Sequence, residues 1–210
     1  MAGLPDSLPL FPLTGALLLP RGRLPLNIFE PRYLAMVDAA LGAARMIGMI
    51  QPLEGKGDAG DPPLHRTGCA GRIVEFRETG DGRYLIALEG VSRFDVAAEL
   101  PKTGLFRRAR PDWSRFGGDR DESDLAGFDA KRFLAALGPY LRKLGASADA
   151  ETSDVAPERL ITAVAMLAPL APAEKQALLE AAPLERARLL TGLIEMALLA
   201  GTRAADSARH

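Results

Sequence analysis

The chain changes character near residue 120, and this change most constrains what it can fold into. Before that point glycine and proline interrupt short apolar runs, and after it come long stretches rich in alanine and leucine. Short interrupted runs are typical of strands, whereas long periodic stretches are typical of amphipathic helices. The polar, glycine-containing segment 116–123 between them has the composition of a linker. We therefore predict a β-rich domain over residues 1–118 and an α-helical bundle over residues 119–210.

The first part is predicted to form a small, strongly bent β-sheet or partial barrel around one helix, which gives the fold class α+β. Strands are predicted at 8–11, 24–28, 45–51, 70–78, 83–89, 94–100 and 105–111. The helix is predicted at 31–41, because the fixed φ of Pro31 suits a first helical position. Asp81-Gly82 predicts a hairpin, since glycine tolerates a positive φ.

The second part is predicted to contain four helices. Their expected ranges are 125–144, 157–167, 172–180 and 183–200. Ser123 is the predicted cap of the first helix, and prolines begin the other three. The last helix has an apolar face formed by Leu184, Ala187, Leu190, Ile194, Ala197 and Leu198.

The composition is that of an ordinary folded protein: 48% of the residues are hydrophobic and the net charge is -1. A non-specific nucleic-acid binder would be clearly basic, and a disordered chain would be less apolar. The single cysteine, Cys69, cannot form an internal disulfide, so the fold does not require an oxidising compartment. No run approaches the roughly 20 apolar residues of a membrane span. We therefore expect a cytoplasmic protein with no membrane partner.

Residue types that perform catalysis or bind metals are scarce. The sequence contains no G-x-x-x-x-G-K-[ST] motif, which would cradle ATP phosphates. The only histidines are His65 and His210, and His65 with Cys69 gives too few ligands for a zinc site. We therefore expect no catalytic residue, no metal, no cofactor and no enzymatic activity.

Three stretches of the sequence resemble the N-terminal substrate-binding domain of Lon proteases. They are segment 8–33, with LPLFPL and LPLNIFEPRY; LEGVSRF at 88–94, which is similar to the family's EGxxR turn; and segment 160–199, with LAPL and EKQALLE. The FEPRY version resembles free-standing members and the related domain of cereblon. The residues that carry these motifs, and for which the resemblance implies a structural role, are Pro9, Phe11, Pro12, Pro20, Leu26, Glu30, Arg32, Tyr33, Gly90 and Arg93.

The resemblance implies a PUA-like bent β-sheet or pseudo-barrel followed by a helical bundle. It also implies binding of unfolded or partly folded polypeptides, without the ATPase and protease domains. No segment resembles the Ser–Lys proteolytic site of Lon. The predicted function is therefore a non-catalytic, ATP-independent adaptor or holdase in protein quality control, acting as a monomer or weak homo-oligomer.

Apolar residues near the N-terminus supply the candidate binding surface. Residues 17–19 and 24–26 flank the sequence PRGR, and we expect some of these side chains to lie on the surface, where apolar patches mark interaction sites. A groove lined by them, beside a free sheet edge, would accept an extended peptide by strand addition. The candidate polypeptide-binding residues are Leu17, Leu19, Arg21, Arg23 and Phe29.

An alternative function is RNA binding through Arg107, Arg108, Arg110 and Trp113. Basic groups neutralise phosphates, and an aromatic side chain stacks on a base. However, alternation puts Arg108 and Arg110 on one strand face, and acidic residues follow closely. We therefore favour a solvated strand face and expect no nucleic-acid partner. A third interpretation is a small-molecule pocket between the two domains, and only a loose analogy with cereblon supports it.

Overall fold

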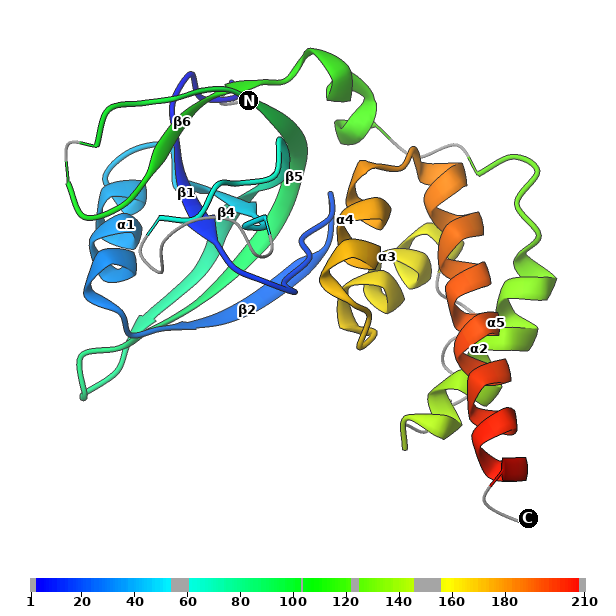
Figure 1. Cartoon of the computed structure of the whole chain (residues 1–210). Coiled ribbons are helices and arrows are strands. Elements are labelled where there is room, and N and C mark those ends of the chain that lie inside the picture. The colour runs from blue at the N-terminus through cyan, green and yellow to red at the C-terminus, as the bar shows by residue number, and fades with distance from the viewer. Residues whose placement is uncertain (1–2, 54–60, 103, 122–124, 146–155, 208–210) are drawn as a thin grey trace. The chain divides into compact units, whose positions relative to one another are not determined.

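The computed structural model describes residues 3–53, 61–102, 104–121, 125–145 and 156–207, with side chains described up to residue 200. Its strands are β1 (Leu8–Pro12), β2 (Arg23–Ile28), β3 (Met46–Ile50), β4 (Thr67–Glu78), β5 (Tyr84–Glu99) and β6 (Arg108–Asp112). Its helices are α1 (Pro31–Leu41), the 3-10 helix η1 (Ser114–Arg120), α2 (Ala130–Lys143), α3 (Pro157–Leu167), α4 (Pro172–Glu180) and α5 (Pro183–Ser207) (Figure 1). The α+β class is confirmed: a six-stranded mixed sheet closes into a ring and is followed by C-terminal helices.

The largest differences between the predicted and the observed elements concern β5 and α2. The predicted strands 83–89 and 94–100 form the single strand β5, because the EGxxR segment is a bulge at Val91 and not a turn. A bulge bends a strand without ending it. The first helix of the second part begins at Ala130 and not at residue 125, since Gly127 has a φ of +79° and Asp129 caps the helix. Ser123, the predicted cap, lies outside the described residues.

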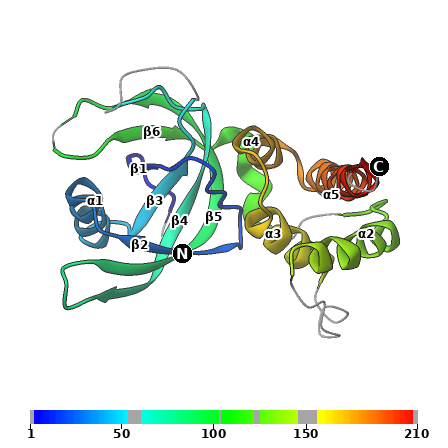
Figure 2. The same ribbon diagram turned by 60° about the horizontal axis from the view of Figure 1, so that its bottom comes forward.

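The bend in β5 allows the sheet to close. The strand order is β2-β5-β4-β3-β1-β6, and an additional β5–β6 pairing completes the ring (Figure 2). The first half of β5 pairs with β2, as in Ile86 with Leu26, and its second half pairs with β6. Phe94 is fully buried among the ring's core side chains. Gly48 and Gly68 make room for it, because a Cβ on either would lie within 2.8 Å of the Phe94 ring.

The leucine segment 17–19 packs against β4 and β5 and is buried throughout. A Cβ on Gly71 would lie 2.7 Å from the Leu18 side chain, and one on Gly90 would lie 2.0 Å from the Leu19 carbonyl oxygen. The N–H of Arg21 donates to the Gly90 carbonyl at 2.8 Å. Of the two apolar stretches expected to lie partly on the surface, residues 17–19 are therefore core, because two glycines without side chains let the whole segment enter it, whereas in 24–26 Pro25 is exposed.

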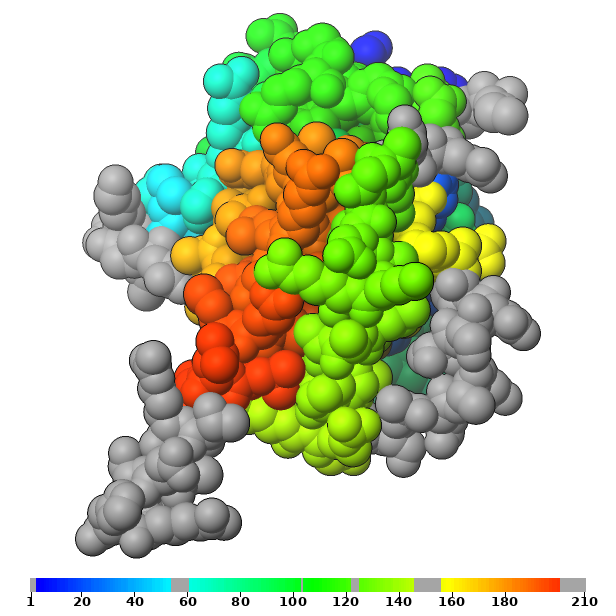
Figure 3. All heavy atoms as spheres, turned by 90° about the vertical axis from the view of Figure 1, so that its right-hand side faces the viewer, coloured from blue at the N-terminus to red at the C-terminus, as the bar shows by residue number. Residues whose placement is uncertain are grey.

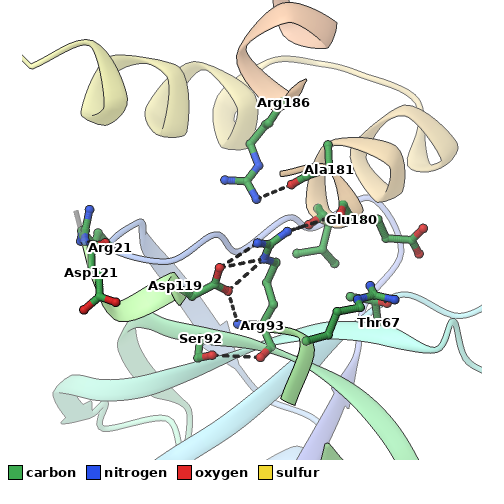
Figure 4. Close-up of polar contacts among 11 residues, drawn as sticks. Arg21, Thr67, Ser92, Arg93, Asp119, Asp121, Glu180, Ala181 and Arg186 are labelled. Carbon is green, nitrogen blue, oxygen red and sulfur yellow. Dashed lines mark hydrogen bonds and ion pairs between the residues drawn. The ribbon is translucent and has the colours of Figure 1, made fainter. Parts of the chain in front are cut away.

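Arg93 joins β5 to two other elements through one buried guanidinium (Figure 4). Its Nη2 and Nε atoms donate to the Asp119 carboxylate of η1 at 2.7 and 2.9 Å, and its backbone N–H donates to the same carboxylate at 2.8 Å. Its Nη1 atom donates to the Leu179 carbonyl at the end of α4, at 3.1 Å. Phe116 packs on the guanidinium at 4.6 Å. Arg93 therefore fixes both η1 and the C-terminal end of α4.

Buried amides also attach α4 to the ring. Gln51 of the β3 end donates to the Gln176 side chain at 3.1 Å, and Gln176 donates to the Thr67 carbonyl at 3.2 Å. Lys175 donates to the Gly15 carbonyl at 2.8 Å, and burial lowers the pKa of its ammonium. By their mutual contacts, residues Met166–Glu180 belong to the same compact unit as Met1–Glu122. The division into domains 1–118 and 119–210 stays a prediction, and in it α4 belongs to the second part.

The other compact unit comprises Ser123–Ala165 and Ala181–His210. In it α2 packs along α5, and Figure 3 shows their side chains in contact. Arg132 on α2 forms a two-pronged ion pair with Glu195 on α5, with both N–O distances at 2.7 Å. Among the described residues no helix is long and apolar enough to cross a membrane.

The contact between Gly90 and the leucine segment predicts a stability change. Gly90→Ala places a Cβ against the Leu19 carbonyl, so we expect a loss of about 2–3 kcal/mol in unfolding free energy. Gly80→Ala is the control, because a Cβ there meets nothing within 4 Å. Urea unfolding followed by the fluorescence of Trp113, the only tryptophan, measures both. Equal midpoints for the two variants would contradict this packing.

The Arg93–Asp119 ion pair predicts non-additive energetics. Arg93→Met or Asp119→Leu leaves the other charge buried without its ion-pair partner, which costs about 3–5 kcal/mol. The double variant leaves no charge orphaned, so it is expected to lose clearly less than the sum of the two single losses. The same urea experiment measures the cycle. Additive losses would mean that the two side chains stabilise the fold independently.

Candidate functional site

The strands β2, β5 and β4 lie side by side in the sheet (Figure 2). A groove crosses one face of these strands. We call it the sheet groove; it has a volume of about 830 Å³ and is lined by Arg23, Pro25, Leu26, Asn27, Glu75, Phe76, Arg77, Leu85, Ile86 and Ala87. Strand alternation positions these side chains, since Arg23, Pro25 and Asn27 are exposed while Ile28 is buried. Leu85 and Ala87 of β5 stand opposite Asn27 and Pro25, so they share this face.

The sheet groove has an apolar floor and a charged rim. Pro25, which is exposed, and Leu85, which is half-buried, supply apolar surface in the groove, and Ala87 lies almost completely buried beneath it. Arg23 on β2 and Glu75 on β4 form an ion pair, and the hydrogen bond from Arg23 lowers the pKa of the Glu75 carboxyl. An apolar centre surrounded by polar groups is the arrangement of many protein interfaces. The groove is therefore chemically suited to an apolar chain segment.

The open edge of β2 borders the groove, but its backbone does not suit strand addition. The Gly90 N–H donates to the Gly22 carbonyl, so by alternation the backbone groups of Arg23, Pro25 and Asn27 face the open edge. Pro25 has no N–H, and proline in this position protects an edge strand from pairing. The groove face, and not the β2 edge, is therefore the surface available to a polypeptide at this site.

A second, smaller hollow of about 160 Å³ lies between the start of α1 and the segment before β6. Its side chains include Tyr33, Leu105 and Phe106. Its cations already have anionic partners: Arg32 contacts Glu30 at 2.8 Å, Lys102 contacts Asp61 at 2.7 Å, and Arg107 contacts Glu99 at 2.5 Å. The hydrogen bond from Lys102 lowers the pKa of the Asp61 carboxyl. These charges are matched within the chain, and the space fits a single side chain rather than an extended segment.

The structure separates the five predicted polypeptide-binding residues. Leu17 and Leu19 have 2% and 0% of their surface exposed, so they belong to the core. The Arg21 backbone is held at Gly90 with a φ of +62°, and its side chain donates to the Asp121 carbonyl. Arg23 lines the sheet groove, and Phe29, which is 61% exposed, follows the end of β2. The binding role of all five stays a prediction; Arg21, Arg23 and Phe29 are exposed, and Arg23 lines the sheet groove.

The family-motif residues occupy turns and contacts of the first unit. Arg32 pairs with Glu30 at the start of α1 and lies 4.4 Å over the Tyr33 ring. Tyr33 stacks on Phe11 with ring centroids 4.3 Å apart. The others lie along the strands and the leucine segment: Pro9 and Pro12 in β1, Leu26 in β2, Pro20 beside Gly90, and Gly90 and Arg93 in β5.

The basic run of the RNA-binding alternative is largely engaged within the protein. Arg107 pairs with Glu99 and also donates to the Pro62 carbonyl at 2.6 Å. Trp113 packs edge-on against Phe94 with ring centroids 5.8 Å apart, as part of the ring's core. Arg108 is half-buried and Arg110 exposed on β6, between buried neighbours. RNA binding stays a prediction, with Arg110 as its most accessible residue.

Sequence reasoning did not find the groove residues on β4 and β5. Alternation in 73–78 predicts a half-buried strand, yet it does not show that its outward side chains Glu75 and Arg77 border a concave surface. No group of three or more histidine, cysteine, aspartate or glutamate side chains able to hold a metal occurs in the described part of the chain. The Cys69 thiol is buried and donates to the Ala70 carbonyl at 3.8 Å.

The chain is similar to bacterial Lon proteases. Lon protease 2 of Myxococcus xanthus is 26% identical over 196 residues, which cover 91% of this chain and 24% of that protein. Lon protease 2 of Sorangium cellulosum is 32% identical over 95 residues, which cover 43% of this chain and 12% of that protein. The aligned part is thus about a quarter or less of the length of these relatives.

Two solved structures share the fold. The crystal structure of a Lon N-terminal domain protein from Xanthomonas campestris matches with a TM-score of 0.62 and 24% identity, covering 89% of this chain and 97% of that chain. The N-terminal domain of the Mycobacterium avium complex Lon protease matches with a TM-score of 0.57 and 17% identity, covering 90% and 98%. At these identities the likeness shows the fold alone.

The family model described as the ATP-dependent protease La (Lon) substrate-binding domain matches residues 7–195. The match covers that domain and no ATPase or protease domain. It confirms the resemblance carried by the motifs at 8–33, 88–94 and 160–199. The chain belongs to the Lon substrate-binding domain family.

Proposed function

We propose that this protein holds unfolded or hydrophobic segments of other proteins in the sheet groove, without ATP and without cleaving them. The observation that carries the proposal is the apolar surface of Pro25 and Leu85 in the groove, which is bordered by charged side chains. The family's description as a substrate-binding domain of a protease supports a polypeptide as the ligand.

The chemistry of an unfolded segment matches this surface. Such a segment exposes apolar side chains, and each square ångström of apolar surface that it buries contributes about 25 cal/mol. The rim carries both signs of charge, with Arg23 and Arg77 beside Glu75, so it does not select strongly for an acidic or a basic sequence. Phe29, which follows the end of β2 and is 61% exposed, offers a further apolar side chain. Broad recognition of apolar segments is what an adaptor or holdase requires.

The proposal also includes independence from nucleotide and a cytoplasmic location. The sequence lacks a phosphate-binding G-x-x-x-x-G-K-[ST] motif, which is in line with holding that does not use ATP. Its single cysteine is buried and cannot form an internal disulfide, which fits a reducing compartment. Whether a protease acts on the held segment is a separate matter, since no protease domain falls within the match.

Two substitutions in and beside the groove test the proposed site. Phe29→Asp and Leu85→Glu each put a carboxylate where an apolar segment would lie, and desolvating it is costly. We expect each to weaken binding of a labelled, permanently unfolded polypeptide by about tenfold or more. Fluorescence anisotropy without nucleotide measures the affinity. Leu105→Asp is the matched control, because Leu105 is also 61% exposed but lines the smaller hollow.

The same titration distinguishes the other possibilities. Binding that changes little with salt and persists in excess RNA supports apolar capture, because phosphate recognition weakens steeply with salt. Loss of binding in Leu105→Asp alone would assign the polypeptide to the smaller hollow. If the wild-type protein does not bind the polypeptide but binds labelled RNA in a salt-sensitive way, the proposal is overturned. RNA binding through residues 107–113 would then be favoured.

A further inference from the structure

The β4 strand has an unpaired edge from Val74 to Glu78. On that side β3 pairs with β4 only as far as Met46 opposite Arg72, and the last contact is the Ile73 N–H to the Arg45 carbonyl at 2.8 Å. On the other side β5 accompanies β4 up to Glu78 opposite Tyr84. Residues 74–78 are all exposed, and within the described ranges no strand pairs with their open side.

Alternation shows which backbone groups face this edge. The Thr79 N–H donates to the Arg83 carbonyl at 2.8 Å, so the Thr79 backbone faces β5. Counting back along the strand, the backbones of Arg77 and Glu75 also face β5, and those of Glu78 and Phe76 face the open edge. No proline interrupts this stretch. Unlike the edge of β2, this one offers both donors and acceptors to a further strand.

The edge sequence Val-Glu-Phe-Arg-Glu is complementary to itself when two copies run antiparallel. If Phe76 stands opposite Phe76 of the second copy, each Glu75 stands opposite an Arg77. Because the Phe76 backbones face the edge, they exchange two hydrogen bonds, and the Glu75–Arg77 pairs take the closely spaced positions without hydrogen bonds. Opposite charges at such positions stabilise an antiparallel pair.

The apolar side chains of the edge are complementary in the same register. Phe76 lies edge-on to Tyr84, with ring centroids 5.0 Å apart, and remains partly exposed. A second Phe76 opposite it would join that aromatic cluster and cover it from solvent. Glu75 is paired with Arg23, yet its side chain is largely exposed. Its carboxylate can therefore accept a further hydrogen bond from a second arginine.

We propose that two copies of this chain associate by pairing their β4 edges antiparallel, with a two-fold axis through Phe76. The occupant is a second copy because the charges and the aromatic residue match in this register. Such an interface is isologous, the commonest kind in homodimers. It joins the two sheets, and hence the two sheet grooves, into one continuous surface. A five-residue edge buries little area, so we expect the association to be weak and to depend on protein concentration.

Charge reversal at the edge tests the proposal by sedimentation velocity, over protein concentrations from about 1 µM to about 1 mM. In a dimer of the Arg77→Glu variant, two pairs of negative charges would face each other across the interface. In a dimer of the Glu75→Arg variant, two pairs of positive charges would do so. Each single variant is expected to dimerise at least about tenfold more weakly than wild type. Lys131→Glu on α2 is the control, because it makes a charge reversal of the same sign as Arg77→Glu on a helix of the other compact unit.

Complementation makes the outcome specific to this register. A mixture of Arg77→Glu with Glu75→Arg places opposite charges at both positions, so the mixture is expected to form heterodimers. The double variant Glu75→Arg/Arg77→Glu is expected to dimerise with itself. A wild-type protein that stays monomeric throughout the concentration range would overturn the proposal. Single variants that dimerise as wild type does, or a mixture that shows no recovery, would also overturn it. Polypeptide binding is not measured here, so failure of this proposal leaves the groove proposal standing.

Discussion

The buried contact between Arg93 and Asp119 is the interaction on which the first unit depends most. Arg93 lies in β5, and its guanidinium reaches a carboxylate of η1 and the last carbonyls of α4 at the same time. A planar guanidinium has donors on several sides, so a single side chain holds three elements together; a lysine ammonium does not have this geometry. The price of burying the charge is offset because Asp119 and the helix carbonyls satisfy its donors.

The sheet groove is a consequence of the same stretch of β5. The bulge at Val91 bends the strand, so its second half closes the ring with β6 while its first half is left to pair with β2. Gly90, one residue before the bulge, receives the backbone of the leucine segment and fixes the start of β2. The EGxxR motif therefore positions the groove without lining it. This explains how a structural motif can accompany a binding surface formed by other residues.

The elements were largely predictable from the sequence, and the surface was not. Prolines and apolar periodicity predict α1, α3 and α4 within a residue or two, because these signals act locally. Burial of Leu17 and Leu19 depends on Gly71 and Gly90, which are more than 50 residues away, so no local pattern reveals it. The attachment of α4 to the ring likewise depends on Gln51 and Arg93. The groove arises from the curvature of three strands, which alternation does not encode.

The central claim, that the sheet groove holds an unfolded segment, is tested most directly by photo-crosslinking. A permanently unfolded polypeptide carrying a photoreactive group is bound to the protein, irradiated, and its attachment sites are mapped by mass spectrometry. The structure predicts adducts at residues 23–29, 75–77 and 85–87, on β2, β4 and β5. Adducts confined to residues 102–107, or to α2 and α5, would contradict it.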